Sequence, residues 1–353
     1  EYAEARNKWE RLYEITQFKG TSEAHPSISP TDEFANFEIW DKGNLGLQTG
    51  KKPEMLKTEY IREALKDGMK LEQQLGTNPF KYGIVGGTDS HTGLTTVEED
   101  NFNGKFKQSE PAPGRWNENS SKTKNGTIKG WEYSGSGWTG VWATSNTREA
   151  LWDAMERREV YATTGPRMTV RFFGGNDYTT EDLNAANMAE RGYTKGVPMG
   201  GDLYTAPAGK KLSFIIDAVK DPMGANLDRV QVIKGWIDAK GNKQEKIYEV
   251  VWGDADKRRL DAKGKLPAVG NTVNIATCEY TNTIGGTELK TVWTDPDFDA
   301  SLSAVYYVRV LEIPTPRWTA FDAMRYKVKM DPNVPMIIQE RCYTSPIWYT
   351  PKK

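Results

Sequence analysis

The spacing of apolar residues changes near residue 167, and this change constrains the fold more than any other feature. Before it, helical spacing over residues 56–75 is followed by an apolar strand at residues 81–85. After Met168, short alternating runs separated by Gly, Pro, Asn and Asp predominate, as in an all-β sandwich. The sequence therefore predicts an α/β part over residues 1–167 and a β-rich part over residues 168–353.

Polar loops follow the strands expected in the first part, which is typical of α/β order. Residues 31–41 are expected to be helical, with Phe34 and Phe37 facing inward. Residues 100–140 are rich in Gly, Asn, Ser and Lys, which predicts a long loop over the surface. A helix opening at residues 146–149 and a strand at residues 160–163 would complete this part.

Composition and charge exclude several classes of protein. The chain of 353 residues has a net charge of −1, and it carries no long basic run of the kind that binds nucleic acid. It also has no stretch of about 18 apolar residues, so no membrane span is expected. The two cysteines, Cys278 and Cys342, leave both a disulfide and two buried thiols open.

The chain has only two histidines, and both lie in polar loops after predicted strands. His91 stands two residues after Asp89, and side chains at this spacing in extended chain point the same way. A carboxylate beside an imidazole suits Zn²⁺, Mn²⁺ or Fe²⁺. Asp89 and His91 are therefore the first candidates for metal ligands, with His25 as a third. The alternative for each is an ordinary capping or loop residue.

Two further residues are candidates for catalytic side chains. Glu23 lies two residues before His25, so it is a candidate ligand, ligand partner or general base, or an ordinary loop carboxylate. Arg167 follows Thr-Gly-Pro at the edge of a predicted strand, where it would bind an anionic group or form a structural ion pair.

These motifs resemble those of a known superfamily. The Asp89-Ser90-His91 loop is similar to the last metal-binding motif of the polymerase-and-histidinol-phosphatase (PHP) superfamily. The segment Ser22-Glu23-Ala24-His25-Pro26 resembles the motif before it, and residues 140–167 resemble the closing helix and strand of that barrel. The chain is closer still to a bacterial family, the domain of unknown function numbered 3604. The segments that carry this likeness are residues 34–41, 309–318 and 345–349.

The resemblance implies the later part of a distorted (β/α)7 barrel followed by a β-sandwich-like domain. It implies a metal-dependent hydrolase of phosphate esters, with two or three metal ions completed by residues absent from this chain. The N-terminal half of the same protein would then be a partner that completes the barrel, and the protein would be exported to the periplasm. The alternative is a non-catalytic protein on a degenerate barrel that binds a carbohydrate or other ligand through aromatic side chains. The candidates for that platform are Trp236, Trp252, Trp293, Trp318 and Trp348.

Overall fold

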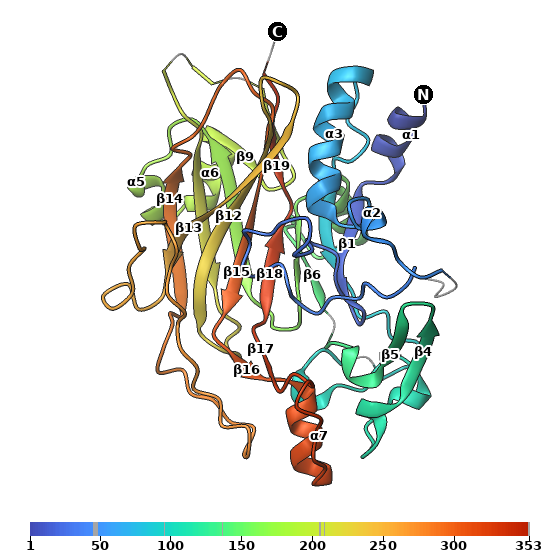
Figure 1. The fold of residues 1–353 in the computed structure, drawn as a ribbon. Helices are drawn as coiled ribbons and strands as arrows, with labels where there is room; N and C mark the ends of the chain where they lie inside the picture. The colour runs from blue at the N-terminus through green and yellow to red at the C-terminus, as the bar shows by residue number, and fades with distance from the viewer. Residues whose placement is uncertain (45–48, 95, 136, 205, 208, 352–353) are drawn as a thin grey trace.

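The computed structural model describes residues 1–44, 49–94, 96–135, 137–204, 206–207 and 209–351. Two β-sheets packed face to face form the body of the molecule, and a smaller α/β layer lies on the outer face of the larger sheet (Figure 1). Across these residues, no helix has the length and apolar character needed to cross a membrane.

The larger sheet has eight strands and is built around β15 (Ala304–Glu312). This strand pairs antiparallel with β12 (Leu227–Ile237) along one edge. Along the other edge it pairs with both β18 (Arg341–Thr344) and β19 (Ile347–Tyr349). The sheet continues from β12 to β13 (Lys243–Trp252), from β19 to β10 (Asp202–Leu203), and from β18 to β7 (Val160–Thr163) and β6 (Trp138–Val141).

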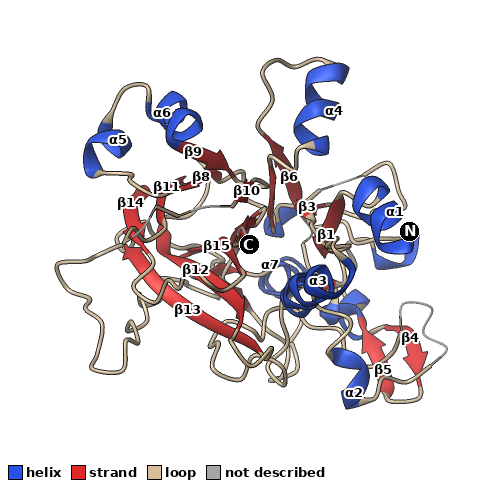
Figure 2. Cartoon of the chain, turned by 90° about the horizontal axis from the view of Figure 1, so that it is seen from above, coloured by secondary structure: helices blue, strands red, loops and turns tan. Residues whose placement is uncertain are grey.

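The smaller sheet has four antiparallel strands. Their order is β14 (Glu288–Thr294), β11 (Ser213–Val219), β8 (Thr169–Gly175) and β9 (Gly196–Pro198). Helices α5 (Thr180–Asn184) and α6 (Met188–Lys195) cover its outer face, where Leu183 and Met188 pack against Phe173 and Ile215. Figure 2 shows both helices beside this sheet.

Alternation along the strands divides the buried residues between two cores. Phe214 of β11 meets Val232 of β12 and Val308 of β15 in the core between the two sheets. The intervening residues of β15, Val305 and Tyr307, point to the opposite face and pack under the α/β layer. The larger sheet is therefore buried on both faces, which explains why β15 is apolar at nearly every position.

The α/β layer is a three-stranded sheet with one long helix. Strand β1 (Leu12–Gln17) lies between β2 (Gly20–Thr21), which is antiparallel to it, and β3 (Gly83–Gly86), which is parallel to it. Helix α3 (Ile61–Leu75) ends at Gly76, whose φ of +76° is the left-handed conformation that favours glycine. Its Ile61, Leu65 and Met69 recur at four-residue spacing and pack onto the larger sheet.

The remaining elements are short and lie around these layers. They are α1 (Tyr2–Trp9), α2 (Pro53–Leu56), α4 (Arg148–Glu156), α7 (Trp318–Tyr326), the hairpin of β4 (Asn119–Thr123) and β5 (Gly126–Lys129), the pair β16 (Thr315–Pro316) and β17 (Ile337–Ile338), and the 3-10 helices Glu99–Asn101, Lys107–Ser109, Arg115–Asn117 and Gly130–Glu132. Three of these 3-10 helices and the hairpin β4–β5 lie within residues 100–140, which were expected to form a long loop.

The expected (β/α)7 barrel is wrong. Among the residues that the structure describes, only β1 and β3 form a parallel pair in the first part of the chain. Strand β7, which was expected to close the barrel, instead pairs antiparallel with β6 and β18 in the larger sheet. The β-rich second part does agree with a sandwich. The division into residues 1–167 and 168–353 stays a prediction, although the larger sheet includes strands from both sides of it.

The helix expected at residues 31–41 is also wrong, because this segment forms a series of turns. The Asp32 carboxylate accepts a hydrogen bond from the backbone N–H of Phe34 at 2.9 Å, which is a side-chain turn that competes with helix.

Cys278 and Cys342 are both free and buried. Cys342 on β18 lies opposite Thr163 on β7. The neighbouring backbone bonds, from Thr164 N–H to Arg341 O and from Ser345 N–H to Val160 O, put this pair at a non-hydrogen-bonded position. Side chains approach most closely at such positions.

This register predicts a new disulfide. Thr163→Cys in a Cys278→Ser background should cross-link to Cys342 on mild oxidation, because directly opposed side chains are within disulfide range. Ala162→Cys is the matched control, since its side chain points to the other face of the sheet. Mass spectrometry of the alkylated, unreduced protein distinguishes the two. Free thiols in both variants would contradict the pairing of β7 with β18.

Candidate functional site

Asp89 and His91 lie in the loop that leaves the carboxyl end of β3. Because β1 and β3 are parallel, the carboxyl end of β1 meets the same edge of the small sheet. This is where binding residues gather in α/β layers. The loop is tied to the larger sheet, since the Thr139 hydroxyl donates to Gly86 O at 2.7 Å and Gly137 N–H donates to Gly87 O at 3.2 Å.

Gly86 lies where β3 packs against the β6–β7 hairpin. A Cβ at this position would lie 3.0 Å from Trp138 O and 3.2 Å from Thr163 O. A larger residue would therefore push β3 a few tenths of an ångström away from the β6–β7 hairpin.

The structure brings Asp89 and His91 together. His91 Nε2 lies 3.1 Å from Asp89 Oδ1, and Lys105 Nζ binds the other carboxylate oxygen. Asp89 has a φ of +50°, which is uncommon outside glycine and is found at functional sites more often than elsewhere. The His91 ring packs edge-on against Phe106, with 5.0 Å between ring centroids.

Two lysines of this edge were missed in the sequence. Lys105 lies 16 residues after Asp89, with its ammonium 3.9 Å from the centre of the Phe18 ring. Lys19 follows β1 and hydrogen-bonds only Ser22 Oγ, at 3.0 Å, among the residues described. Burial lowers the pKa of Lys19, and the nearby charge of Lys51 lowers it further, while Asp89 acts in the opposite direction. No local sequence pattern marks either lysine: Lys105 reaches Asp89 by tertiary contact, and Lys19 is brought to this edge by its position after β1.

Lys19 lines a cavity of about 310 Å³ beside this edge. Lys51 also lines it, but its ammonium pairs with Glu59 at 2.7 Å. Among the charged side chains described there, Lys19 is therefore the one without an acidic partner, and it is the residue placed to receive an anionic group.

His25 lies in a different environment. Its ring is buried against Tyr60, with 5.4 Å between ring centroids. Nδ1 lies 2.7 Å from Ser27 Oγ, and Nε2 lies 3.4 Å from Asp41 Oδ2. Within the described part of the chain, His25 makes no contact with Asp89 or His91, and no three His, Cys, Asp or Glu side chains converge as a metal site.

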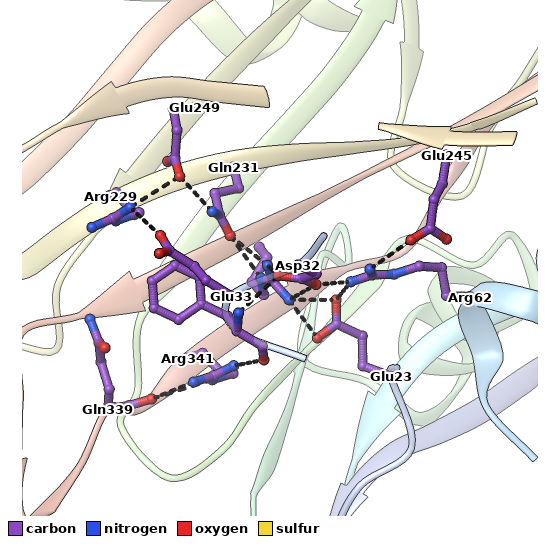
Figure 3. A network of polar contacts seen from close by, with 12 residues as sticks. Glu23, Asp32, Glu33, Arg62, Arg229, Gln231, Glu245, Glu249, Gln339 and Arg341 are labelled. Atoms are coloured by element: carbon purple, nitrogen blue, oxygen red, sulfur yellow. Dashed lines mark hydrogen bonds and ion pairs between the residues drawn. The ribbon is translucent and has the colours of Figure 1, made fainter. Parts of the chain in front are cut away.

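Glu23 lies in a buried ionic network rather than at the sheet edge (Figure 3). Its carboxylate accepts hydrogen bonds from Arg62 at 2.6 Å, from the Tyr307 hydroxyl at 2.7 Å and from Arg309 at 3.0 Å. Burial alone would raise the pKa of Glu23, but the guanidinium groups of Arg309 and Arg62 outweigh it and hold the pKa below its ordinary value. As a general base, Glu23 would first have to leave this network.

Asp32 completes the charge balance of the network. Its carboxylate accepts hydrogen bonds from Arg309 at 2.7 Å and from Arg62 at 2.8 Å. Burial alone would raise the pKa of Asp32, but the same two guanidinium groups hold it below its ordinary value. The Gln231 side-chain oxygen accepts a hydrogen bond from Arg309 at 2.7 Å, and its amide nitrogen donates one to Glu249, which extends the network to β13. The pKa values of Glu23 and Asp32 are lower in the folded protein than in the unfolded chain. The two carboxylates therefore stabilise the fold fully above about pH 4, and this stabilisation is lost as the pH falls toward their folded-state pKa values.

Arg167 has no hydrogen bond or ion pair with Asp89, His91 or His25 in the described structure. Its backbone N–H donates to Asp221 Oδ2 at 2.7 Å, and its guanidinium lies 5.5 Å from the centre of the Trp138 ring. It lines a second cavity, where it is the one basic residue beside six carboxylates among the described lining residues.

Fold and site together define a β-sandwich protein with an attached α/β layer that carries an Asp–His pair among lysines. The chain belongs to the family described as "Protein of unknown function (DUF3604)", whose model matches residues 1–351. Neither the curated proteins nor the solved structures contain a match to it.

The network leads to a prediction about stability. Arg309→Met should lower the free energy of unfolding by about 3–5 kcal/mol, because it removes one of the two guanidinium groups that the buried carboxylates of Glu23 and Asp32 share and leaves them with Arg62 alone. Lys246→Met is the control. It breaks the exposed pair with Asp297 and should cost less than about 1 kcal/mol. Urea unfolding of the two variants tests this, and equal small losses would show that the network contributes little.

Proposed function

We propose that this chain is part of a metal-dependent hydrolase of phosphate esters, with Asp89 and His91 as metal ligands. The observation that carries the proposal is the approach of Asp89 Oδ1 to His91 Nε2 at 3.1 Å. Two ligands that share one ion through bonds of about 2.0–2.2 Å lie roughly 3 Å apart. The pair shares a hydrogen bond in this structure, and its separation is close to that of two neighbouring ligands of one Zn²⁺, Mn²⁺ or Fe²⁺ ion.

The lysines support an anionic substrate. Lys105 already binds Asp89, and Lys19 faces the adjoining cavity without an acidic partner. An ammonium beside a metal ligand can hold a phosphate oxygen and offset its charge. A bound metal ion would supply an activated water. The protein's part is to orient the ester against Lys19 and to keep the loop of Asp89 fixed through Thr139 and Gly137.

The relation to the PHP superfamily is part of this proposal. It rests on the Asp89-Ser90-His91 loop after a strand and on the His25-Pro26 pair. An Asp–His pair supplies fewer ligands than the three or more that a catalytic ion needs. The others, and those of any further ion, would come from His25 after a rearrangement or from a segment outside this chain that packs on the same edge. Export to the periplasm is proposed on the family resemblance alone.

No specific observation favours the carbohydrate platform. Trp318 and Trp348 are each 1% exposed, and Trp236, Trp252 and Trp293 are half-buried. A platform for sugar rings needs aromatic faces that are open to solvent.

The metal ligands are tested by metal content. Purified protein in equilibrium dialysis against Zn²⁺ or Mn²⁺ should bind the ion, and Asp89→Asn and His91→Asn should each bind less at the same free concentration, because each removes one of the two ligands that this chain supplies. The control is Asp297→Asn, an exposed carboxylate outside the site. His25→Asn shows whether His25 is a further ligand. Plasma mass spectrometry measures the result, and equal metal in the wild type and both site variants would contradict the assignment.

The phosphate specificity is tested by kinetics. Lys19→Met should lower kcat/KM for an aryl phosphate ester by roughly 10-fold to 100-fold, since a hydrogen bond to a charged group contributes about 1.5–3 kcal/mol. Its fold should be retained, because the substitution removes a partly buried charge. Lys246→Met should leave kcat/KM unchanged. An unchanged rate in Lys19→Met would remove this lysine from the proposed site.

A further inference from the structure

A second cavity, of about 550 Å³, lies at the opposite end of β15 from the sandwich loops near residue 300. Its wall includes the end of β15, the 3-10 helix Glu99–Asn101, and loops at residues 165–167, 221–225 and 278–280. The volume is in the range of small-molecule sites, about 300–1,000 Å³. It shares no lining residue with the cavity at Lys19.

Acidic side chains outnumber basic ones in the wall of this cavity. Six carboxylates line it, and Arg167 is the one basic residue among the described lining residues. The six are Glu98, Glu99, Asp100, Asp221, Glu312 and Glu340. Such an excess of one charge attracts the opposite charge.

Glu312 shows that the cavity is more than an acidic surface. It is the last residue of β15, it is 1% exposed, and its side chain lines the cavity. Its Oε1 is buried without a hydrogen-bond partner, and within the described structure the carboxylate forms no ion pair. A buried carboxylate in this state is unfavourable unless a cation or donor approaches it.

Glu340 adds a second buried carboxylate. It is 3% exposed, its Oε2 accepts a hydrogen bond from the Thr164 hydroxyl, and its carboxyl group contacts that of Glu99, with which it can share a proton. Burial raises the pKa values of Glu312 and Glu340, and the neighbouring carboxylates Asp221 and Glu99 raise them further. A bound positive charge would relieve both effects.

The geometry favours an organic cation over a metal ion. Among the described residues, no three acidic side chains converge closely enough to hold a metal. Apolar and aromatic side chains complete the wall, among them Val97, Pro166, Tyr280 and Phe321. These surfaces suit a hydrocarbon or aryl body, and aromatic rings also attract cations.

We propose that this cavity binds a small organic cation, with an ammonium or amidinium head paired to Glu312 and Glu340 and an apolar body against Tyr280 and Phe321. The site is separate from the metal site proposed at Asp89 and does not depend on it.

The test uses benzamidinium and phenethylammonium as probes, with neutral benzamide and 2-phenylethanol as matched isosteres. Titration calorimetry on the whole chain should show binding of a cation and none of its neutral isostere. Glu312→Gln should weaken that binding by about tenfold or more, because it keeps the shape and removes the charge. Asp100→Asn, which changes an exposed carboxylate of the same wall, should change it less than about threefold.

Glu312→Gln is expected to fold, since it removes a buried charge without a partner, and circular dichroism checks this. Glu340→Gln is an independent second variant and should also weaken binding. The proposal is overturned if neither cation binds the folded wild type, if benzamide binds as tightly as benzamidine, or if the glutamine variants bind the cations unchanged.

Discussion

The balanced ionic network of Glu23, Asp32, Arg62 and Arg309 joins the two main parts of this protein. Its carboxylates come from the loop after β2, one arginine comes from α3, and the other comes from β15 at the centre of the larger sheet. Two negative and two positive groups meet where the side chains are almost fully buried. Such a network is stable only when every member is present, so it fixes the loop of residues 22–33 relative to the sandwich.

The buried sheet beneath the α/β layer positions the candidate metal site. Burial of the larger sheet on both faces forces the α/β layer to lie on it, and β3 then packs against the β6–β7 hairpin through Gly86. The loop after β3 leaves this junction with Asp89 in a left-handed conformation that presents its carboxylate to His91 and Lys105. The positions of Asp89 and His91 therefore depend on how β3 packs against the larger sheet.

Local patterns predicted the features that depend on neighbouring residues. The helical spacing of Ile61, Leu65 and Met69 indicated α3, and alternation indicated the β-rich second part. The Asp-x-His spacing indicated that Asp89 and His91 are neighbours, but a left-handed Asp89 brings them together and not the extended chain that was expected. Pairing between distant segments was not predictable in this way. Strand β7 has the composition of a buried parallel strand but pairs antiparallel with β18, which follows almost 180 residues later.

The same limit applies to Glu23 and the lysines. Glu23 looked like a neighbour of His25, but its arginine partner Arg309 is 286 residues away, and that contact decides its role. The turns at residues 31–41 arise because Asp32 binds arginines from other elements and because the Arg341 guanidinium stacks on Phe37, 3.7 Å from the ring centre. The tertiary structure brings Lys19 and Lys105 to this edge of the small sheet, so no sequence motif could predict them.

Anomalous diffraction at the manganese absorption edge, from crystals of the protein soaked with Mn²⁺, tests the central assignment most directly. The account predicts an anomalous peak within about 2.0–2.3 Å of both Asp89 Oδ1 and His91 Nε2. A crystal in which Lys105 still pairs with Asp89 and no peak lies between Asp89 and His91 would contradict it.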